Sequence, residues 1–329
     1  YAAELATRIG TFYPTGMVED HNGLNNDRFD EAGYLEECNI AMRGRRDMML
    51  YELKRFEEGL FFCLFDTPDR VQHMFWRFRE NDHPANPGGT ASELKHAIED
   101  NYPACDAIVG EAMGFSDDQT LVVVLSDHGF NSFQRGLHLN TWLHDNGFLA
   151  LRSGVNPGQE NGDFFPNVDW SRTKAYALGL ATVYLNLKGR EGKGIVAPEE
   201  AELVKAEIVK GLSGLVDVQR QKVAVRSVMT REQLYKGPYA GEAPDLVINF
   251  SEGYRVSWAT ALGGVPEGLF EDNVKRWSGD HIIDPVLVPG VLLMNRTFRG
   301  ENPSLLDVAP TILSALGVPQ GPAMEGKSL

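Results

Sequence analysis

Three short stretches of the sequence each place an acidic side chain close to a histidine. The pairs are Asp69 with His73, Asp127 with His128, and Asp280 with His281. Carboxylate oxygens and imidazole nitrogens are ligands of Zn²⁺, and Mn²⁺ or Fe can use the same donors. The chain has only eight histidines, so three such pairs are a concentrated signal. Together they predict a metal site assembled from separate segments.

Each pair has a purely structural alternative when it is taken alone. An Asp and a His four residues apart also occur on ordinary helix surfaces, and SDHG can form a turn in which the Asp127 carboxylate bonds the backbone. His281 alone would be an ordinary loop histidine. Two of the pairs follow predicted strands and the third lies between two of them. Ligands of open α/β sheets bind beyond the carboxyl ends of strands, which favours metal binding.

Two further polar residues follow the SDHG stretch. Arg135 and His138 are predicted to hold an anionic substrate near the metal site, because a basic side chain and an imidazole suit that task. The alternative is that His138 caps or packs against the helix that follows it. The remaining histidines with polar neighbours are predicted to be solvated: His21, His83, His96 and His144.

The apolar pattern predicts the elements that position these residues. Helical spacing is found over 31–58, and a helix follows Asp69. A second helix is expected over 92–113, interrupted or restarted near Pro103. Continuous apolar runs predict buried strands at 59–65, 121–125, 245–250 and 290–295. A last helix is predicted within 304–317, with Ser304 as its N-cap and Gly317 at its end.

Alternation of strands and helices predicts an α/β fold with a mainly parallel central sheet flanked by helices on both faces. Within it, residues 1–150 and 241–329 are expected to form the core. Residues 151–240 alternate more strongly and contain a helix-like PEEAELVKAEIVKGL, so they are predicted to form a smaller inserted α+β subdomain.

Composition limits the possible partners. The chain has 329 residues and a formal net charge of -15, which disfavours nucleic-acid duplexes and anionic membranes. No segment has the apolar length of a membrane span, and the first residues do not resemble a signal peptide. The three cysteines match neither a disulfide framework nor a zinc knuckle, and they slightly favour a reducing, cytoplasmic compartment.

Several stretches in order along the chain resemble the alkaline phosphatase superfamily, in its type I phosphodiesterase/nucleotide pyrophosphatase branch. They are TPDRVQHMFW, LVVVLSDHGF, LHLNTWL, APDLVINF, SGDHIIDPVLVPGVLLMN, DVAPTILSALGVP and MEGKSL. The resemblance implies an alkaline-phosphatase-like fold. It further implies an enzyme that hydrolyses phosphodiester or pyrophosphate bonds of phosphorylated small molecules or nucleotides.

The resemblance also implies a set of ligands. It places Asp69, His73 and His281 on one divalent ion, and Asp127 and His128 on a second. The ions are usually zinc, and they flank a phosphoryl group during in-line displacement at phosphorus.

One part of the family pattern is not matched. The family takes another aspartate ligand, and then a threonine or serine nucleophile, from an early strand and the helix after it. Before residue 31 no apolar strand ends in Asp, and Thr15 follows no strand. The expectation is therefore an incomplete chain whose nucleophile lies upstream of Tyr1. Such a chain would have little activity alone, and its exposed sheet edge would favour self-association.

Two alternatives to this function remain open. The chain could be a non-catalytic protein that holds metal and binds phosphorylated ligands. It could also have another activity of the superfamily: phosphatase, phosphonate hydrolase, sulfatase or cofactor-independent phosphoglycerate mutase. The HMFW and HLNTWL stretches favour the phosphodiesterase branch.

Overall fold

The computed structural model describes residues 1–13, 18–86, 92–159, 163–298 and 300–329. The chain forms two compact units. The first comprises Tyr1–Asn81, Gly88–Gly129 and Gly290–Leu329, and the second comprises Asp82–Pro87 and Phe130–Pro289. Thr15 lies outside the described residues. No helix in the described part of the chain is long and apolar enough to cross a membrane.

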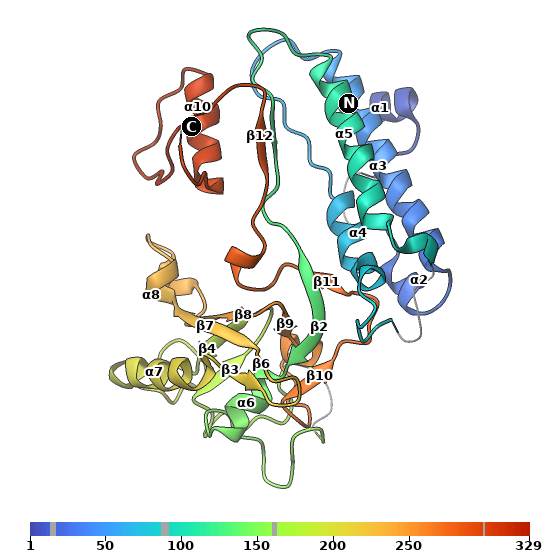
Figure 1. Cartoon of the computed structure of the whole chain (residues 1–329). Helices are drawn as coiled ribbons and strands as arrows, with labels where there is room; N and C mark the ends of the chain where they lie inside the picture. The colour runs from blue at the N-terminus through green and yellow to red at the C-terminus, as the bar shows by residue number, and fades with distance from the viewer. Residues whose placement is uncertain (14–17, 87–91, 160–162, 299) are drawn as a thin grey trace. The chain divides into compact units, whose positions relative to one another are not determined.

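The first unit is built on a layer of helices. Three of them, α3 (Glu31–Leu53), α4 (Thr67–Phe75) and α5 (Ala97–Met113), lie side by side (Figure 1). The shorter helices are α1 (Ala2–Ile9), α2 (His21–Asn25), and the 3-10 turns η1 (Trp76–Arg79) and η2 (Ser92–Leu94). The prediction over 31–58 is confirmed as far as Leu53, and α5 continues through Pro103 without a break. Met42, Met49 and Ile108 form the buried centre of this layer.

The predicted buried strand at 59–65 is wrong. Residues 61–65 belong to no strand of the described chain. Phe61, Cys63 and Phe65 pack on the helical layer, and the alternating burial of this stretch is typical of an extended segment. The intervening side chains face solvent: Leu60 is 58% exposed, Phe62 77% and Leu64 57%. The run is apolar on both sides, but only one of its sides is covered.

The first unit also contains a short two-stranded sheet. Strand β1 (Val123–Leu125) pairs antiparallel with β12 (Leu292–Met294), with Val124 opposite Leu293. After β12 come η6 (Leu305–Asp307) and α10 (Val308–Ala315). The predicted caps of this last helical segment are confirmed. The Ser304 hydroxyl accepts from the Leu306 amide at 3.0 Å, and Gly317 has a φ of 69°.

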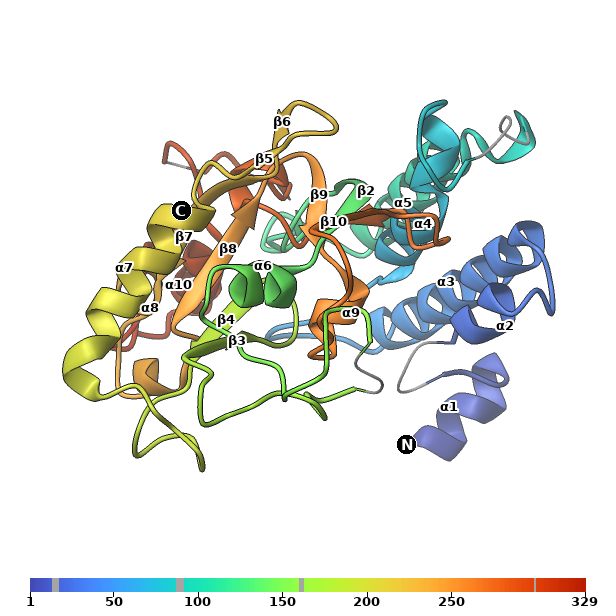
Figure 2. The ribbon, with the colours of Figure 1, turned by 90° about the horizontal axis from the view of Figure 1, so that it is seen from below.

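The second unit contains a four-stranded antiparallel sheet in the order β3-β4-β8-β7. Its strands are β3 (Ala175–Ala177), β4 (Thr182–Leu185), β7 (Val225–Thr230) and β8 (Leu246–Phe250). Helix α7 (Ala201–Leu212), preceded by η3 (Pro198–Glu200), lies along this sheet and contacts β7 (Figure 2). The core here is apolar and large, with Ile208 and Phe250 fully buried.

A second sheet in this unit is centred on β2 (Asn131–Leu137). Strand β9 (Gly253–Val256) pairs with it in parallel, whereas β10 (Phe270–Asp272) and β11 (Gly279–Asp280) pair antiparallel. The remaining elements of the unit are α6 (Leu139–Asp145), β5 (Val216–Asp217), β6 (Lys222–Val223), α8 (Arg231–Leu234), η4 (Ala240–Glu242), α9 (Trp258–Ala261) and η5 (Pro285–Leu287).

The α/β fold class is confirmed, but a mainly parallel central sheet is not. Among the described strands, β2 with β9 is the one parallel pair. The apolar runs at 245–250 and 290–295 do form strands, yet each pairs antiparallel. An apolar run indicates burial but carries no information on the direction of its neighbours. The predicted insert at 151–240 stays a prediction, and β7 pairs with β8 across its expected border.

Candidate metal centre

The first functional pair lies on α4. Pro68 stands in the first turn of this helix, and Asp69 and His73 are one turn apart on the same face. Asp69 Oδ1 is 3.4 Å from His73 Nε2, and the His73 side chain is only 3% exposed. This separation exceeds that of a good hydrogen bond, which is about 2.7–3.2 Å. The two atoms are therefore adjacent on one side of the helix without a strong hydrogen bond between them.

Arg70 orients the Asp69 carboxylate. Its Nη1 donates to Asp69 Oδ2 at 2.6 Å, while Oδ1 faces the histidine. Arg70 Nε lies 4.0 Å from Oε2 of the buried Glu19, whose pKa is raised by burial. A carboxylate held at one oxygen presents the other in a defined direction. Sequence reasoning missed Arg70, although a basic residue directly after a candidate ligand was a usable signal.

The second pair follows β1 and lies in the same unit as the first. His128 Nε2 is 4.0 Å from Asp69 Oδ1 and 3.6 Å from Asp127 Oδ1. His128 Nδ1 is 2.9 Å from the Gly129 carbonyl oxygen, to which it donates when it carries the proton, so that Nε2 keeps its lone pair. The preceding Ser126 is tied to the neighbouring strand, because its hydroxyl accepts from the Val291 amide at 3.0 Å.

Within each pair, the separation fits two ligands of one cation. Ligand atoms at about 2.0–2.2 Å from a tetrahedral Zn²⁺ are about 3.3–3.6 Å from one another. The distance from Asp69 to His73 is 3.4 Å and that from Asp127 to His128 is 3.6 Å. The Asp127 side chain is 72% exposed, so it is open to an additional ligand or to water. The donor set and its spacing suit a divalent metal.

His281 belongs to the second unit and follows β11. Its ring meets the edge of the Phe130 ring, with the centroids 5.3 Å apart. Its backbone N–H donates to Asp280 Oδ1 at 2.8 Å. The predicted convergence of His281 with Asp69 and His73 stays a prediction.

Arg135, predicted to bind substrate, lies in a buried network. Its guanidinium donates to Asp272 Oδ1 at 2.6 Å and also to Asp217 and Gln219. Its charge lies 5.5 Å from the centroid of the Phe270 ring. A substrate contact would therefore require the loss of bonds that hold this part of the second unit together.

His138, the other predicted substrate ligand, is buried as well. Its Nδ1 is 2.7 Å from the Ser257 hydroxyl, and its Nε2 is 3.8 Å from Glu271. Burial lowers the pKa of His138 to about 4. The imidazole is therefore neutral near pH 7 and carries no charge to attract an anion, so its substrate role stays a prediction with little geometric support.

Two histidines predicted to be solvated are not. His83 is buried: its Nδ1 accepts from the Ala85 amide at 3.1 Å, so its Nε2 donates to the Phe133 carbonyl, also at 3.1 Å. His21 is half-buried, and its Nε2 lies 2.8 Å from the Tyr34 hydroxyl. Polar neighbours in sequence misled the prediction, because the partners that bury these rings come from other segments.

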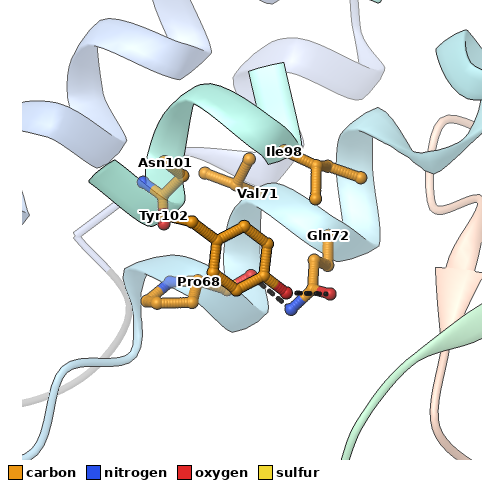
Figure 3. Close-up of a pocket in the computed structure, with 6 residues that line it drawn as sticks. All are labelled: Pro68, Val71, Gln72, Ile98, Asn101 and Tyr102. Carbon is orange, nitrogen blue, oxygen red and sulfur yellow. Dashed lines mark hydrogen bonds between the residues drawn. The ribbon is translucent and has the colours of Figure 1, made fainter. Parts of the chain in front are cut away.

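A shallow depression, with no enclosed space for a water molecule, lies between α4 and α5. Figure 3 shows its six lining residues: Pro68, Val71, Gln72, Ile98, Asn101 and Tyr102. Gln72 donates to the Pro68 carbonyl at 3.0 Å and accepts from the Tyr102 hydroxyl at 3.4 Å. None of the predicted metal ligands lines this depression.

Comparison with known families places most of the chain in an established family. The model of the type I phosphodiesterase/nucleotide pyrophosphatase family matches residues 14–263. This range includes Asp69, His73, Asp127 and His128, and it ends before His281. No curated protein matches the chain.

Proposed function

Because the chain belongs to the type I phosphodiesterase/nucleotide pyrophosphatase family of the alkaline phosphatase superfamily, we propose that it is a metal-dependent hydrolase of phosphodiester or pyrophosphate bonds. The family acts on phosphorylated substrates and nucleotides. One observation carries the metal dependence. Asp69 Oδ1 lies 3.4 Å from His73 Nε2 and 4.0 Å from His128 Nε2, so three donor atoms from two segments of one unit face each other.

The proposed ligand assignment follows the residue pairs. Asp69, His73 and His281 would hold one ion, and Asp127 and His128 would hold the second. Zinc is the favoured metal, and Mn or Fe could use the same donors. Two such ions, when bound, supply positive charge for the phosphoryl oxygens during displacement.

The protein itself orients these donors. Arg70 holds Oδ2 of Asp69 at 2.6 Å, so that Oδ1 keeps its direction. The Gly129 carbonyl, 2.9 Å from Nδ1 of His128, favours the proton on Nδ1 and keeps Nε2 available as a ligand.

The test is a matched pair of histidine variants. His73→Ala removes a buried imidazole that faces Asp69, whereas His144→Ala removes a half-buried surface histidine that pairs with its neighbour Asp145. We expect His73→Ala to weaken metal binding and to lower kcat/KM on a chromogenic phosphodiester at least 100-fold. The His144→Ala control should remain within about twofold of the parent.

Metal content measured beside turnover separates the candidate functions. Bound metal, activity that chelator removes, and recovery on adding Zn²⁺ support the hydrolase. Bound metal without turnover on any phosphoester supports the binding protein instead. Equal rates with and without chelator contradict metal dependence.

A further inference from the structure

The loop that carries His281 is organised by one buried carboxylate. Asp280 Oδ1 accepts from the backbone N–H groups of His281 at 2.8 Å and of Ile282 at 3.0 Å. Its other oxygen, Oδ2, accepts from Arg255 Nη1 at 2.6 Å and from Trp277 Nε1 at 2.9 Å. One oxygen thus holds the loop backbone, and the other is held by two side chains.

The side chains that hold Asp280 are themselves packed against aromatic rings. Arg255 lies on β9, and its guanidinium carbon is 4.0 Å from the centroid of the Trp258 ring and 4.6 Å from that of the Phe133 ring. The Trp258 and Trp277 rings meet edge to face, with centroids 6.0 Å apart. The Arg255 guanidinium therefore lies against two aromatic rings. Its hydrogen bond to Asp280 Oδ2 in turn holds the Asp280 carboxylate in place.

Stability alone is a weak explanation of this arrangement. A buried ion pair is often no more stabilising than apolar side chains of the same volume. Arg255 Nη2 is buried and has no hydrogen-bond partner in the described structure, and burial lowers the pKa of this guanidinium. Apolar side chains could fill this space, but they could not accept hydrogen bonds from two consecutive amides.

We propose that Arg255 and Trp277 act through Asp280 as positioning residues for His281. The Asp280 carboxylate holds the backbone amides of residues 281 and 282. The position of this backbone then limits where the His281 imidazole can lie. The inference rests on the proposed role of His281 as a metal ligand. Its geometric basis lies wholly within the second unit.

The test uses variants of different severity in the full chain. Trp277→Phe removes one hydrogen bond to Asp280 and keeps most of the ring, with Trp170→Phe as the control for loss of an indole in the same unit. Arg255→Met removes the ion pair, whereas Arg255→Lys keeps a charged donor. Amide hydrogen exchange at His281 and Ile282 and Zn²⁺ affinity against a competing chelator are measured for each.

We expect Trp277→Phe and Arg255→Met to speed exchange at the two amides and to weaken Zn²⁺ binding about tenfold or more. Arg255→Lys should recover most of the affinity that Arg255→Met loses, and Trp170→Phe should leave it unchanged. Faster unfolding without any change in exchange at these amides or in Zn²⁺ affinity would overturn the inference.

The two readouts keep this inference separate from the proposed function. A parent protein that binds no Zn²⁺ refutes the metal site, while amide exchange still reports whether Asp280 holds the loop. A parent that binds Zn²⁺, with variants that bind it equally well, refutes the positioning role alone.

Discussion

Replacing Arg135 by Met separates a structural role from substrate binding. The Arg135 side chain is 6% exposed, and it is bonded to Asp217, which is 1% exposed, as well as to the half-exposed Asp272. Removing the guanidinium leaves the Asp217 carboxylate buried without its cationic partner. Asp217 keeps hydrogen bonds from the Tyr254 hydroxyl at 3.2 Å and the Gln219 amide at 3.0 Å, which offset part of the loss.

The expected loss of stability is large for a single substitution. Breaking a buried ion pair costs about 3–5 kcal/mol, and the remaining donors to Asp217 place the expected loss near 3 kcal/mol. Arg220→Met is the matched control. Arg220 bonds the same Asp272 oxygen at 2.8 Å, but the Arg220 side chain is 28% exposed. We therefore expect its replacement to lower the free energy of unfolding by about 1 kcal/mol or less.

Urea unfolding of both variants gives the free energies, and kinetics on a chromogenic phosphodiester give KM for the folded protein. If Arg135 has a structural role, Arg135→Met should lose much of its stability while its KM stays unchanged. An unchanged unfolding free energy together with a raised KM would show that Arg135 binds substrate and that the burial argument is wrong.

Two further predictions concern pH and solubility. Burial lowers the pKa of His138 to about 4, below its unfolded value of about 6.5, so its contribution to stability is complete above pH 6.5 and declines as the pH falls toward 4. Between pH 7 and pH 5 the parent should lose about 2 kcal/mol more than His138→Gln in urea unfolding; parallel curves would contradict this. Phe62→Lys should reduce self-association in light scattering without lowering the Tm, because this side chain is 77% exposed, and the half-buried Phe61→Lys should instead lower the Tm.

Local features of the fold were predictable from sequence. The long helix after Asp30 follows from its apolar spacing, and Ser304 and Gly317 were recognised because capping depends on residues only a few positions apart. The strand at 59–65 was mispredicted because an apolar run does not reveal whether both of its sides are covered. Its side chains alternate between the helical layer and solvent.

The same limit applies to the candidate site. The Asp69 and His73 pair was predictable, since four residues of helix bring two side chains to one face. Asp69 and His128 come from separate segments, so their closeness could not be read from spacing along the chain. The family resemblance assigned these two residues to different ions. The roles of Arg70 and Asp280 were not predicted. The place of Arg70 directly after Asp69 was a usable signal, whereas nothing in the residue type of Asp280 indicates that its carboxylate will meet Arg255.

The sequence by itself determined the long helix after Asp30, the caps of the last helical segment, the family and the residue types that can bind metal, because each depends on neighbouring residues or on motifs read in order. Only the tertiary structure decided the direction of strand pairing, the burial of Arg135 and the hold of Arg255 on Asp280. Arg135 meets Asp217 from 82 positions away and Asp272 from 137, and Arg255 meets Asp280 from 25. Such contacts form only when the folded chain brings distant segments together, and burial then sets their strength.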